Sequence, residues 1–207
     1  MLTTLAAAAL ALTAIVPTGG VVQEEAPPEY VTVDLVTING SGCPAGTTAV
    51  AASPDRTSFT VTYSNYLAQA GADTEPTDFR KNCQLALRVN YPQGFTYGVA
   101  QADYRGFAHL QPGATAMEQA GYYFQGQSGT ARKSHTFRGP QSDNWQATDS
   151  TEWGSIVFAP CGERKILNVN TELRVNAGSS RGTSFIVMDS TDGNASTRYH
   201  FSWKRCS

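Results

Sequence analysis

The sequence predicts an all-β protein, a two-sheet antiparallel β-sandwich in a single domain with two disulfides. Short segments in which apolar and polar residues alternate recur along the chain, and this is the period of half-buried strands. Gly, Pro, Asn and Asp separate these segments at the intervals typical of sandwiches. The sequence has neither a long amphipathic helical pattern nor an internal repeat, so we expect strands to form almost the whole domain.

Residues 1–19 are expected to form a signal peptide. The first 17 residues carry no charged side chain and end at a Pro-Thr-Gly-Gly break, and the apolar run is too short to span a bilayer. Cleavage is expected somewhere between residues 14 and 20. The alternative is a buried N-terminal helix. Residues 20–29 form a polar, proline-containing segment that we expect to be flexible, and the secreted domain is expected to cover residues 30–207.

The stretch from residue 83 to residue 99 is expected to form a central hairpin. Leu85, Leu87 and Val89 fall on one face of a strand, because side chains alternate across it. Residues 91–94, Tyr-Pro-Gln-Gly, supply turn chemistry. Apolar alternation then resumes along residues 95–110, where small residues predict a bend near Ala102 or Gly106.

Other strands are expected on both sides of this hairpin, at residues 30–38, 47–52, 57–63, 117–127, 134–138, 145–148, 153–158, 165–176, 184–188 and 197–204. Residues 64–82 do not have a strand pattern. They are expected to form a long loop with one helical turn at residues 66–70, attached to the domain through Cys83.

The charge balance excludes several classes of partner. The chain has 15 basic and 17 acidic residues, a net charge of −2, and removing the leader changes neither number. Binding to nucleic acid or to an anionic membrane surface requires a basic field. We therefore expect no nucleic acid partner. With no further apolar stretch long enough to span a membrane, we expect no integral membrane segment in the mature chain. We also expect the protein to be a monomer.

Four cysteines, Cys43, Cys83, Cys161 and Cys206, follow the leader. An even number in a secreted chain predicts two disulfides, for which three pairings are possible. We expect Cys43–Cys83 and Cys161–Cys206, because each closes the shorter loop. No CxxC spacing and no zinc-finger histidine interval occur, so neither a metal site nor a cofactor is expected.

No residue is assigned a catalytic role. The three histidines, His109, His135 and His200, are not linked by sequence to an activated Ser or Cys. A glycosidase would need two acids across a sugar bond, and Glu118, Glu152 and Glu172 lie in strand-like contexts. The turn at residues 188–194 is rich in oxygen ligands for calcium but does not have EF-hand spacing, so a plain turn is the simpler interpretation.

Three further residues are candidates for glycan attachment or for ligand contact. Asn39 and Asn194 begin N-glycosylation sequons in expected turns. Trp145 has the polar neighbours Ser142-Asp143-Asn144 and Gln146. An exposed indole there could stack on a sugar or anchor a protein, and core packing is the competing interpretation.

Seven stretches together resemble a known family: residues 39–44 (NGSGCP), 78–83 (DFRKNC), 92–97 (PQGFTY), 104–106 (YRG), 158–162 (FAPCG), 171–176 (TELRVN) and 188–190 (MDS). They are similar to the secreted microbial family called domain of unknown function 4360. The resemblance runs from about residue 30 to residue 206 and implies a secreted single domain with the same four cysteines. It implies no catalytic residue.

Together these observations favour a non-enzymatic extracellular binding or effector-like protein that acts on a protein or glycan ligand. Two alternatives remain open. One is a secreted polysaccharide hydrolase that uses two strand-borne carboxylates. The other is a protease inhibitor that presents the loop at residues 64–82.

Overall fold

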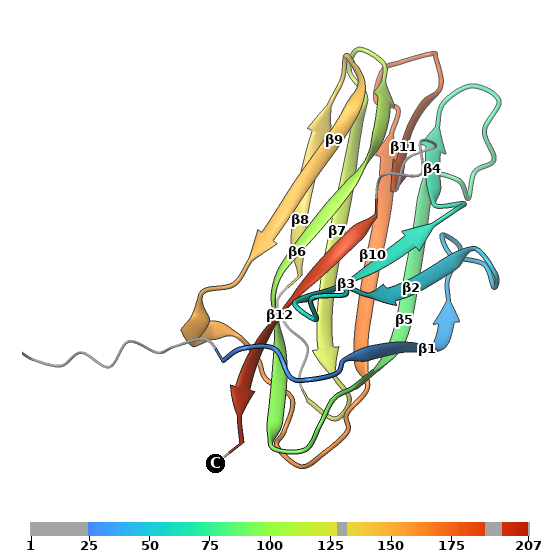
Figure 1. Ribbon diagram of the computed structural model, residues 1–207. Helices are drawn as coiled ribbons and strands as arrows, with labels where there is room; N and C mark the ends of the chain where they lie inside the picture. Colours follow the sequence, from blue (N-terminus) through green and yellow to red (C-terminus); the bar gives the residue numbers. More distant parts are fainter. Residues whose placement is uncertain (1–24, 128–131, 189–195, 207) are drawn as a thin grey trace, which may run out of the picture.

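The computed structural model describes residues 25–127, 132–188 and 196–206 (Figure 1). The expected signal peptide, Asn194 and residues 189–194 of the expected turn lie outside the described residues. Within them there are twelve strands and one short 3-10 helix. The elements are β1 Thr32–Asn39, β2 Thr48–Ala52, β3 Ser58–Tyr63, β4 Leu67–Ala70, β5 Arg80–Asn90, β6 Phe95–Leu110, β7 Thr115–Phe124, β8 Lys133–Arg138, β9 Gln141–Ser150, η1 Trp153–Ser155, β10 Leu167–Asn176, β11 Ser184–Met188 and β12 Thr197–Arg205.

The strands form two antiparallel sheets, as the sequence predicts. Sheet A has five strands in the order β1-β5-β10-β7-β8. Sheet B has seven: the order is β2-β3-β12-β6-β11-β4, and β9 pairs with β6. In Figure 1 the long strands β5, β10 and β7 lie side by side. The two-sheet sandwich with two disulfides is therefore confirmed.

The core lies between the sheets and is built by the alternation that the sequence shows. Leu85, Leu87, Val169 and Leu173 of sheet A are fully buried. Sheet B contributes an aromatic cluster that includes Tyr97, Phe59, Tyr199, Phe201 and Trp203, and their ring centroids lie 4.8–5.8 Å apart where they pack in pairs. Offset and edge-to-face contacts of this kind each contribute about 1 kcal/mol beyond area burial.

The expected central hairpin is wrong. β5 belongs to sheet A and β6 to sheet B, so the turn between them carries the chain from one sheet to the other. In this turn, Tyr91 packs edge-to-face on Tyr97 of β6 at 5.4 Å. Alternation reports which face of a strand is buried, and it does not report which strand is its hydrogen-bonded neighbour.

Two local expectations are also corrected. The helical turn expected at residues 66–70 is strand β4, which pairs with β11; tertiary pairing outweighs the helical preference of the Leu-Ala-Gln-Ala sequence. The strand expected at residues 153–158 is the helix η1 followed by a single bridge between Gly98 and Phe158. Trp153 and Phe158 instead hold Lys204 by cation–π contacts.

Both expected disulfides are present. Cys43–Cys83 ties the turn after β1 to β5, and Cys161–Cys206 ties the segment after η1 to the residue that follows β12. At the other end of the chain, Pro28 is buried and Arg56 donates a 2.8 Å hydrogen bond to the carbonyl of Glu29. None of the described residues belongs to a helix long and apolar enough to cross a membrane.

Candidate binding site

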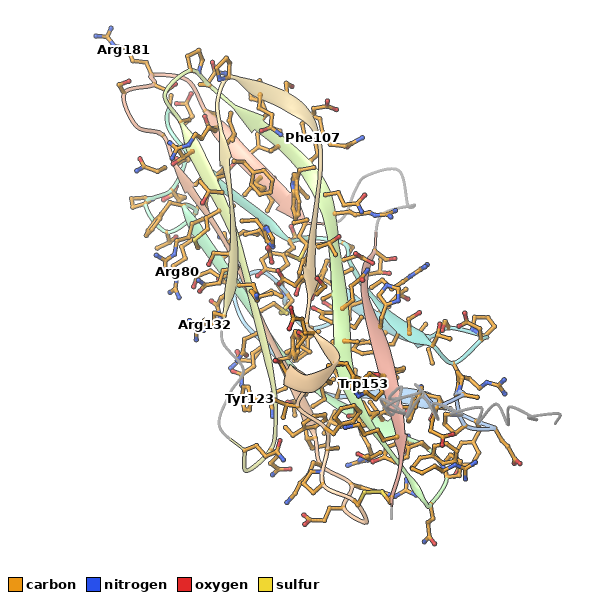
Figure 2. All side chains as sticks on the ribbon, turned by 90° about the vertical axis from the view of Figure 1, so that its left-hand side faces the viewer. Arg80, Phe107, Tyr123, Arg132, Trp153 and Arg181 are labelled. Atoms are coloured by element: carbon orange, nitrogen blue, oxygen red, sulfur yellow. A yellow bond between two sulfur atoms is a disulfide. The ribbon has the colours of Figure 1, made fainter. Side chains whose placement is uncertain are left out.

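The outer face of sheet A is covered by polar side chains on its three central strands. The inward residues of these strands build the core, so the residues between them point outward. These outward residues include Arg80, Asn82, Gln84, Ala86 and Arg88 on β5, Asn168, Asn170, Glu172 and Arg174 on β10, and Met117, Gln119, Gly121 and Tyr123 on β7. Figure 2 shows Arg80, Arg132 and Tyr123 along one side of the molecule.

Strand register arranges these side chains in rows. Asn170 stands between Gln84 and Gly121, and in the next row Glu172 stands between Asn82 and Gln119. Residues directly opposite in an antiparallel pair have Cβ atoms about 5 Å apart. Amide side chains from three strands that are distant in sequence therefore become immediate neighbours.

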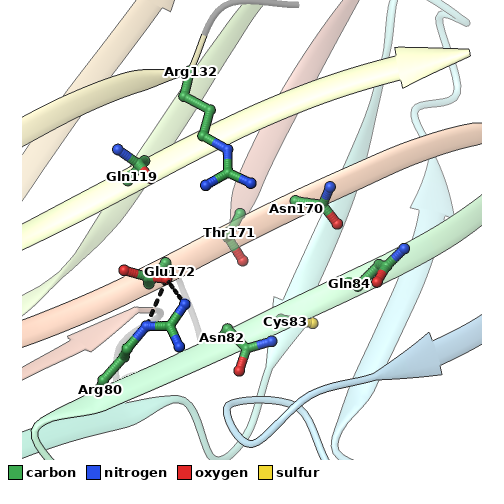
Figure 3. A pocket seen from close by; sticks show the side chains of 9 residues that line it. All are labelled: Arg80, Asn82, Cys83, Gln84, Gln119, Arg132, Asn170, Thr171 and Glu172. Carbon is green, nitrogen blue, oxygen red and sulfur yellow. Dashed lines mark hydrogen bonds and ion pairs between the residues drawn. The ribbon is translucent and has the colours of Figure 1, made fainter. Parts of the chain in front are cut away.

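A groove of about 200 Å³ crosses these rows (Figure 3). It is lined by Arg80, Asn82, Cys83, Gln84, Gln119, Arg132, Asn170, Thr171 and Glu172. Gly121 helps to explain the hollow, because β7 has no side chain at the position opposite Asn170. The side chain of Arg132 lies over this gap: a Cβ added to Gly121 would lie 3.2 Å from Arg132 Cγ.

One carboxylate organises the charges at the end of the groove. Glu172 accepts a 2.8 Å hydrogen bond from Arg80 Nε, a further bond from Arg80 Nη2, and pairs with Arg174. Burial alone would raise the pKa of Glu172, but the contacts with the two guanidinium groups outweigh it and hold the pKa below its ordinary value. Arg132 has neither an ion pair nor a hydrogen bond within the described part of the chain.

Glu118 lies on the neighbouring strand β7, and its surroundings are the opposite of those of Glu172. It points into the sandwich, is fully buried, and its two carboxyl oxygens have no hydrogen-bond partner among the described residues. Burial, and then the charge of Asp149, raise the pKa of Glu118 to about 8. Glu118 is therefore a neutral acid at pH 7. Asp149 Oδ1 lies 2.9 Å from His135 Nε2, within hydrogen-bond distance.

The three acids considered for hydrolysis do not meet in one groove. Glu118 lies in the core, Glu172 lies on the outer face of sheet A, and Glu152 is exposed just before η1. Among the described residues that line the groove, Glu172 is the only carboxylate. The pair of acids that glycoside hydrolysis requires is not assembled there.

Trp145 is not the exposed residue that its polar neighbours suggested. It is only 5% exposed and its ring centroid lies 5.1 Å from that of Phe137. It stands opposite Gly106 in β6, where an added Cβ would lie 2.7 Å from the indole. The missing side chain of Gly106 thus makes room for the ring, and the polar residues Asn144 and Gln146 occupy the opposite face of β9.

The histidines have carboxylate or hydroxyl partners that sequence reasoning missed. His200 lies 2.8 Å from Asp103, which also accepts a 2.7 Å bond from Thr148. His109 lies 3.1 Å from Ser142. Each pair joins strands distant in sequence. No group of three or more His, Cys, Asp or Glu placed to hold a metal ion occurs within residues 25–127, 132–188 and 196–206.

The other candidates lie at the edges of this site. Asn39 is exposed at the end of β1 and pairs in register with Gln84, beside the groove. In the stretch proposed as an inhibitory loop, Asp78 is held by Lys81 at 2.8 Å and by Gln69 at 3.0 Å. That loop is attached to the domain by side chains on both of its flanks.

Residues 29–206 match the model of a family described as a domain of unknown function (DUF4360). The chain belongs to this family. A secreted, uncharacterized protein of Arthroderma benhamiae is 35% identical over 179 residues, which is 86% of this chain and 73% of the relative. This relative and the two disulfides identify the DUF4360 protein as a secreted, extracellular protein.

Two solved structures show only remote similarity. The enzymatically active domain of the bacteriophage CBA120 tailspike protein 4 is 11% identical with a TM-score of 0.28; the match covers 74% of this chain and 19% of that one. A protein chain of the cowpea mosaic virus empty particle is 10% identical with a TM-score of 0.24; the match covers 91% of this chain and 85% of that one. Scores this low carry no argument about the fold or the function of this protein.

Proposed function

We propose that this DUF4360 protein is a non-enzymatic extracellular polysaccharide-binding protein and that the outer face of sheet A is its binding face. The observation that supports this is the arrangement of Asn82, Gln84, Gln119 and Asn170 around one groove. Each amide offers a carbonyl acceptor and an NH₂ donor. A pair of neighbouring amides can therefore bond adjacent hydroxyls of a sugar, each of which both donates and accepts.

The scaffold beneath these amides supports binding by a preformed surface. They project from the central strands of the sheet, and the disulfide of Cys83 anchors β5 directly beside Asn82 and Gln84. Side chains on such strands lose less freedom on binding than side chains on a loop, so less of the binding energy is lost to ordering.

The groove favours binding over hydrolysis. Its carboxylate, Glu172, is engaged by Arg80 and Arg174, and its pKa is lowered, which is the reverse of what a general acid needs at neutral pH. No second acid lines the groove among the described residues. Of the two partner classes expected from the sequence, an extracellular protein or an extracellular glycan, this proposal keeps the glycan and moves its site from Trp145 to sheet A.

The sequence expectations for processing are part of the same proposal. Residues 1–19 direct secretion and are removed, and Asn39 and Asn194 carry N-glycans in a host that glycosylates these sequons. Exposure of Asn39 at the end of β1 is compatible with a glycan there.

The experiment compares a groove variant with a matched surface variant. Gln84→Ala combined with Asn170→Ala removes two groove amides, and Gln146→Ala removes an exposed amide from β9 in sheet B. Binding is measured by affinity electrophoresis through gels that contain neutral or acidic polysaccharides. Because one hydrogen bond contributes about 1 kcal/mol, we expect the double variant to lose about tenfold or more in affinity. Wild-type affinity of the double variant, or no binding by the wild type in any gel, would contradict the proposal.

A further inference from the structure

The geometry points to an acidic polysaccharide as the ligand, with the carboxylate of a uronic acid unit bound by Arg132. This inference rests on the proposed function, since it assigns the chemical class of the chain that occupies the groove. It goes further by naming the residue that would select a charged sugar over a neutral one.

Arg132 lies where a ligand in the groove would meet its guanidinium group. Its side chain runs from the start of β8 across Gly121, and Figure 3 shows its guanidinium over the groove, above Thr171 and beside Gln119. A guanidinium is a planar fork of five N–H donors that matches a carboxylate in a bidentate manner. Its donors have no partner within the described part of the chain, so they are available to a ligand.

Arg132 contrasts with the two arginines at the end of the groove, Arg80 and Arg174. Arg80 and Arg174 both pair with Glu172. In and directly beside the groove, three guanidinium groups therefore stand against one carboxylate, on a chain whose net charge is −2. A locally cationic groove on a slightly acidic protein attracts an anionic ligand to this face in particular.

The size of the groove fits part of a polymer better than a whole small molecule. At about 200 Å³ it is smaller than the roughly 300–1,000 Å³ of sites that enclose a small molecule. The outer face continues beyond the groove through Asn168 and Tyr123, which stand opposite each other in register. These dimensions suit one or two units of a chain that lies across the sheet, with Tyr123 available for stacking on a further unit.

Gly121 is assigned a positioning role. Any larger residue there would place a Cβ 3.2 Å from Arg132 Cγ, so the Arg132 side chain would have to shift by a few tenths of an ångström. Gly121→Ala should therefore impair recognition of the acid without removing a charge.

The test uses two polymers with one backbone: polygalacturonate, and the same polymer with its carboxylates methyl-esterified. Dissociation constants are measured by isothermal titration calorimetry at 50 and 200 mM NaCl. We expect the wild type to bind the acidic form about tenfold or more tighter at low salt, because bonds to a charged acceptor are about twice as strong as neutral ones. Arg132→Gln should lose this preference for the acidic polymer but keep its affinity for the ester. Gly121→Ala should lose part of the preference for the acidic polymer.

Arg138→Gln is the matched control, since it removes the same charge from an exposed position at the other end of β8. It should keep most of the preference for the acid. Circular dichroism and thermal midpoints equal to those of the wild type establish that each variant is folded.

The outcomes separate the two levels of the claim. Equal affinity for the two polymers overturns the inference and leaves the proposed function standing, whereas no affinity for either, together with none for any neutral polysaccharide, overturns the proposed function itself. If Arg132→Gln and Arg138→Gln lose the same affinity for polygalacturonate, the acid is bound by general charge attraction, and this result overturns the assigned site. Poly-glutamate that binds as tightly as polygalacturonate overturns the saccharide class.

Discussion

Glu118 and Glu172 sit on the neighbouring strands β7 and β10 of one sheet, and both are largely buried, yet their chemistry is opposite. Glu118 faces the interior, where no donor reaches it and its pKa rises to about 8. Glu172 faces outward, where Arg80 and Arg174 lower its pKa. The difference arises from the face of the strand on which each residue lies.

This contrast assigns different roles to the two faces of sheet A. The inner face carries a carboxyl group that the fold tolerates as a neutral acid, so it links stability to pH. The outer face keeps its charges ionised and in fixed positions, which is what recognition of a ligand requires. The predictions below test whether the two roles can be separated.

The largest expected effect is the pH dependence caused by Glu118. Below about pH 4.5 its carboxyl is protonated in both the folded and the unfolded chain. Between pH 4.5 and 8 the unfolded chain releases the proton and the folded chain keeps it, so stability falls as pH rises. At 1.36 kcal/mol per pH unit, the free energy of unfolding falls by roughly 4–5 kcal/mol across this window.

Glu118→Gln should remove this dependence, and urea denaturation between pH 4 and 9 measures it. The variant should match the wild type near pH 4 and exceed its stability at pH 9. Glu172→Gln is the control and should keep the alkaline loss. An identical alkaline loss in Glu118→Gln and the wild type would mean that the interior carboxyl does not titrate as described.

Loss of the disulfide Cys43–Cys83 should have a comparable effect that does not depend on pH. The bond closes a loop of 40 residues, and the chain-entropy model gives about 4 kcal/mol for such a loop. The double variant Cys43→Ala, Cys83→Ala should lose this amount of unfolding free energy in urea. Because Cys83 also lines the groove, affinity for polysaccharide should fall as well.

The matched control is Cys161→Ala with Cys206→Ala, which opens a loop of similar size, 45 residues, away from the groove. It should lose similar stability and keep the binding affinity of the remaining folded protein. A similar loss of affinity in both double variants would show that the groove depends on overall stability and not on the anchoring of β5.

Glu172→Gln should change stability little and binding more. Its partners Arg80 and Arg174 have side chains 48% and 50% exposed, and exposed pairs contribute about 1 kcal/mol or less. Removing the one carboxylate of the groove also removes repulsion of an anionic ligand. Affinity for polygalacturonate should therefore rise several-fold in calorimetry, and a fall would contradict the expectation that repulsion by Glu172 outweighs its positioning of the two arginines.

The smallest expected effect concerns the sequon at Asn39. This residue pairs with Gln84 at the edge of the groove, so a glycan there should restrict access to it. In protein from a glycosylating host, with occupancy established by mass spectrometry, Asn39→Gln should raise polysaccharide affinity by a few-fold. The same variant from bacterial expression should show no change, and a change there would point to a direct role of the Asn39 side chain.

Sequence reasoning succeeded where the information is local. The strands Phe95–Leu110 and Ser184–Met188 have the bounds that alternation predicts, and the shorter-loop rule identified both disulfides. Pairing is not local, and the expected hairpin of β5 with β6 failed for that reason. For Trp145 the structure shows core packing, the competing interpretation, because its polar sequence neighbours lie on the opposite face of β9.

The candidate site could not be predicted for the same physical reason. Its residues come from four segments near positions 82, 119, 132 and 170, and only the pairing of β5, β10, β7 and β8 brings them together. One signal was present in the sequence. Along β10 the outward positions are Asn168, Asn170, Glu172 and Arg174. They alternate with Leu167, Val169, Thr171, Leu173 and Val175, four of which are apolar. Such a strand indicates that one face of the sheet is polar.

The most direct test of the proposed binding face is an amide NMR titration of ¹⁵N-labelled protein with an oligogalacturonide. The side-chain amides of Asn82, Gln84, Gln119 and Asn170 and the Arg132 Nε–H report on the groove, and Gln146 reports on the outer face of sheet B. We predict saturable shifts for the groove signals and none for Gln146. Shifts that gather on sheet B, with the groove signals unmoved at saturation, would contradict this account.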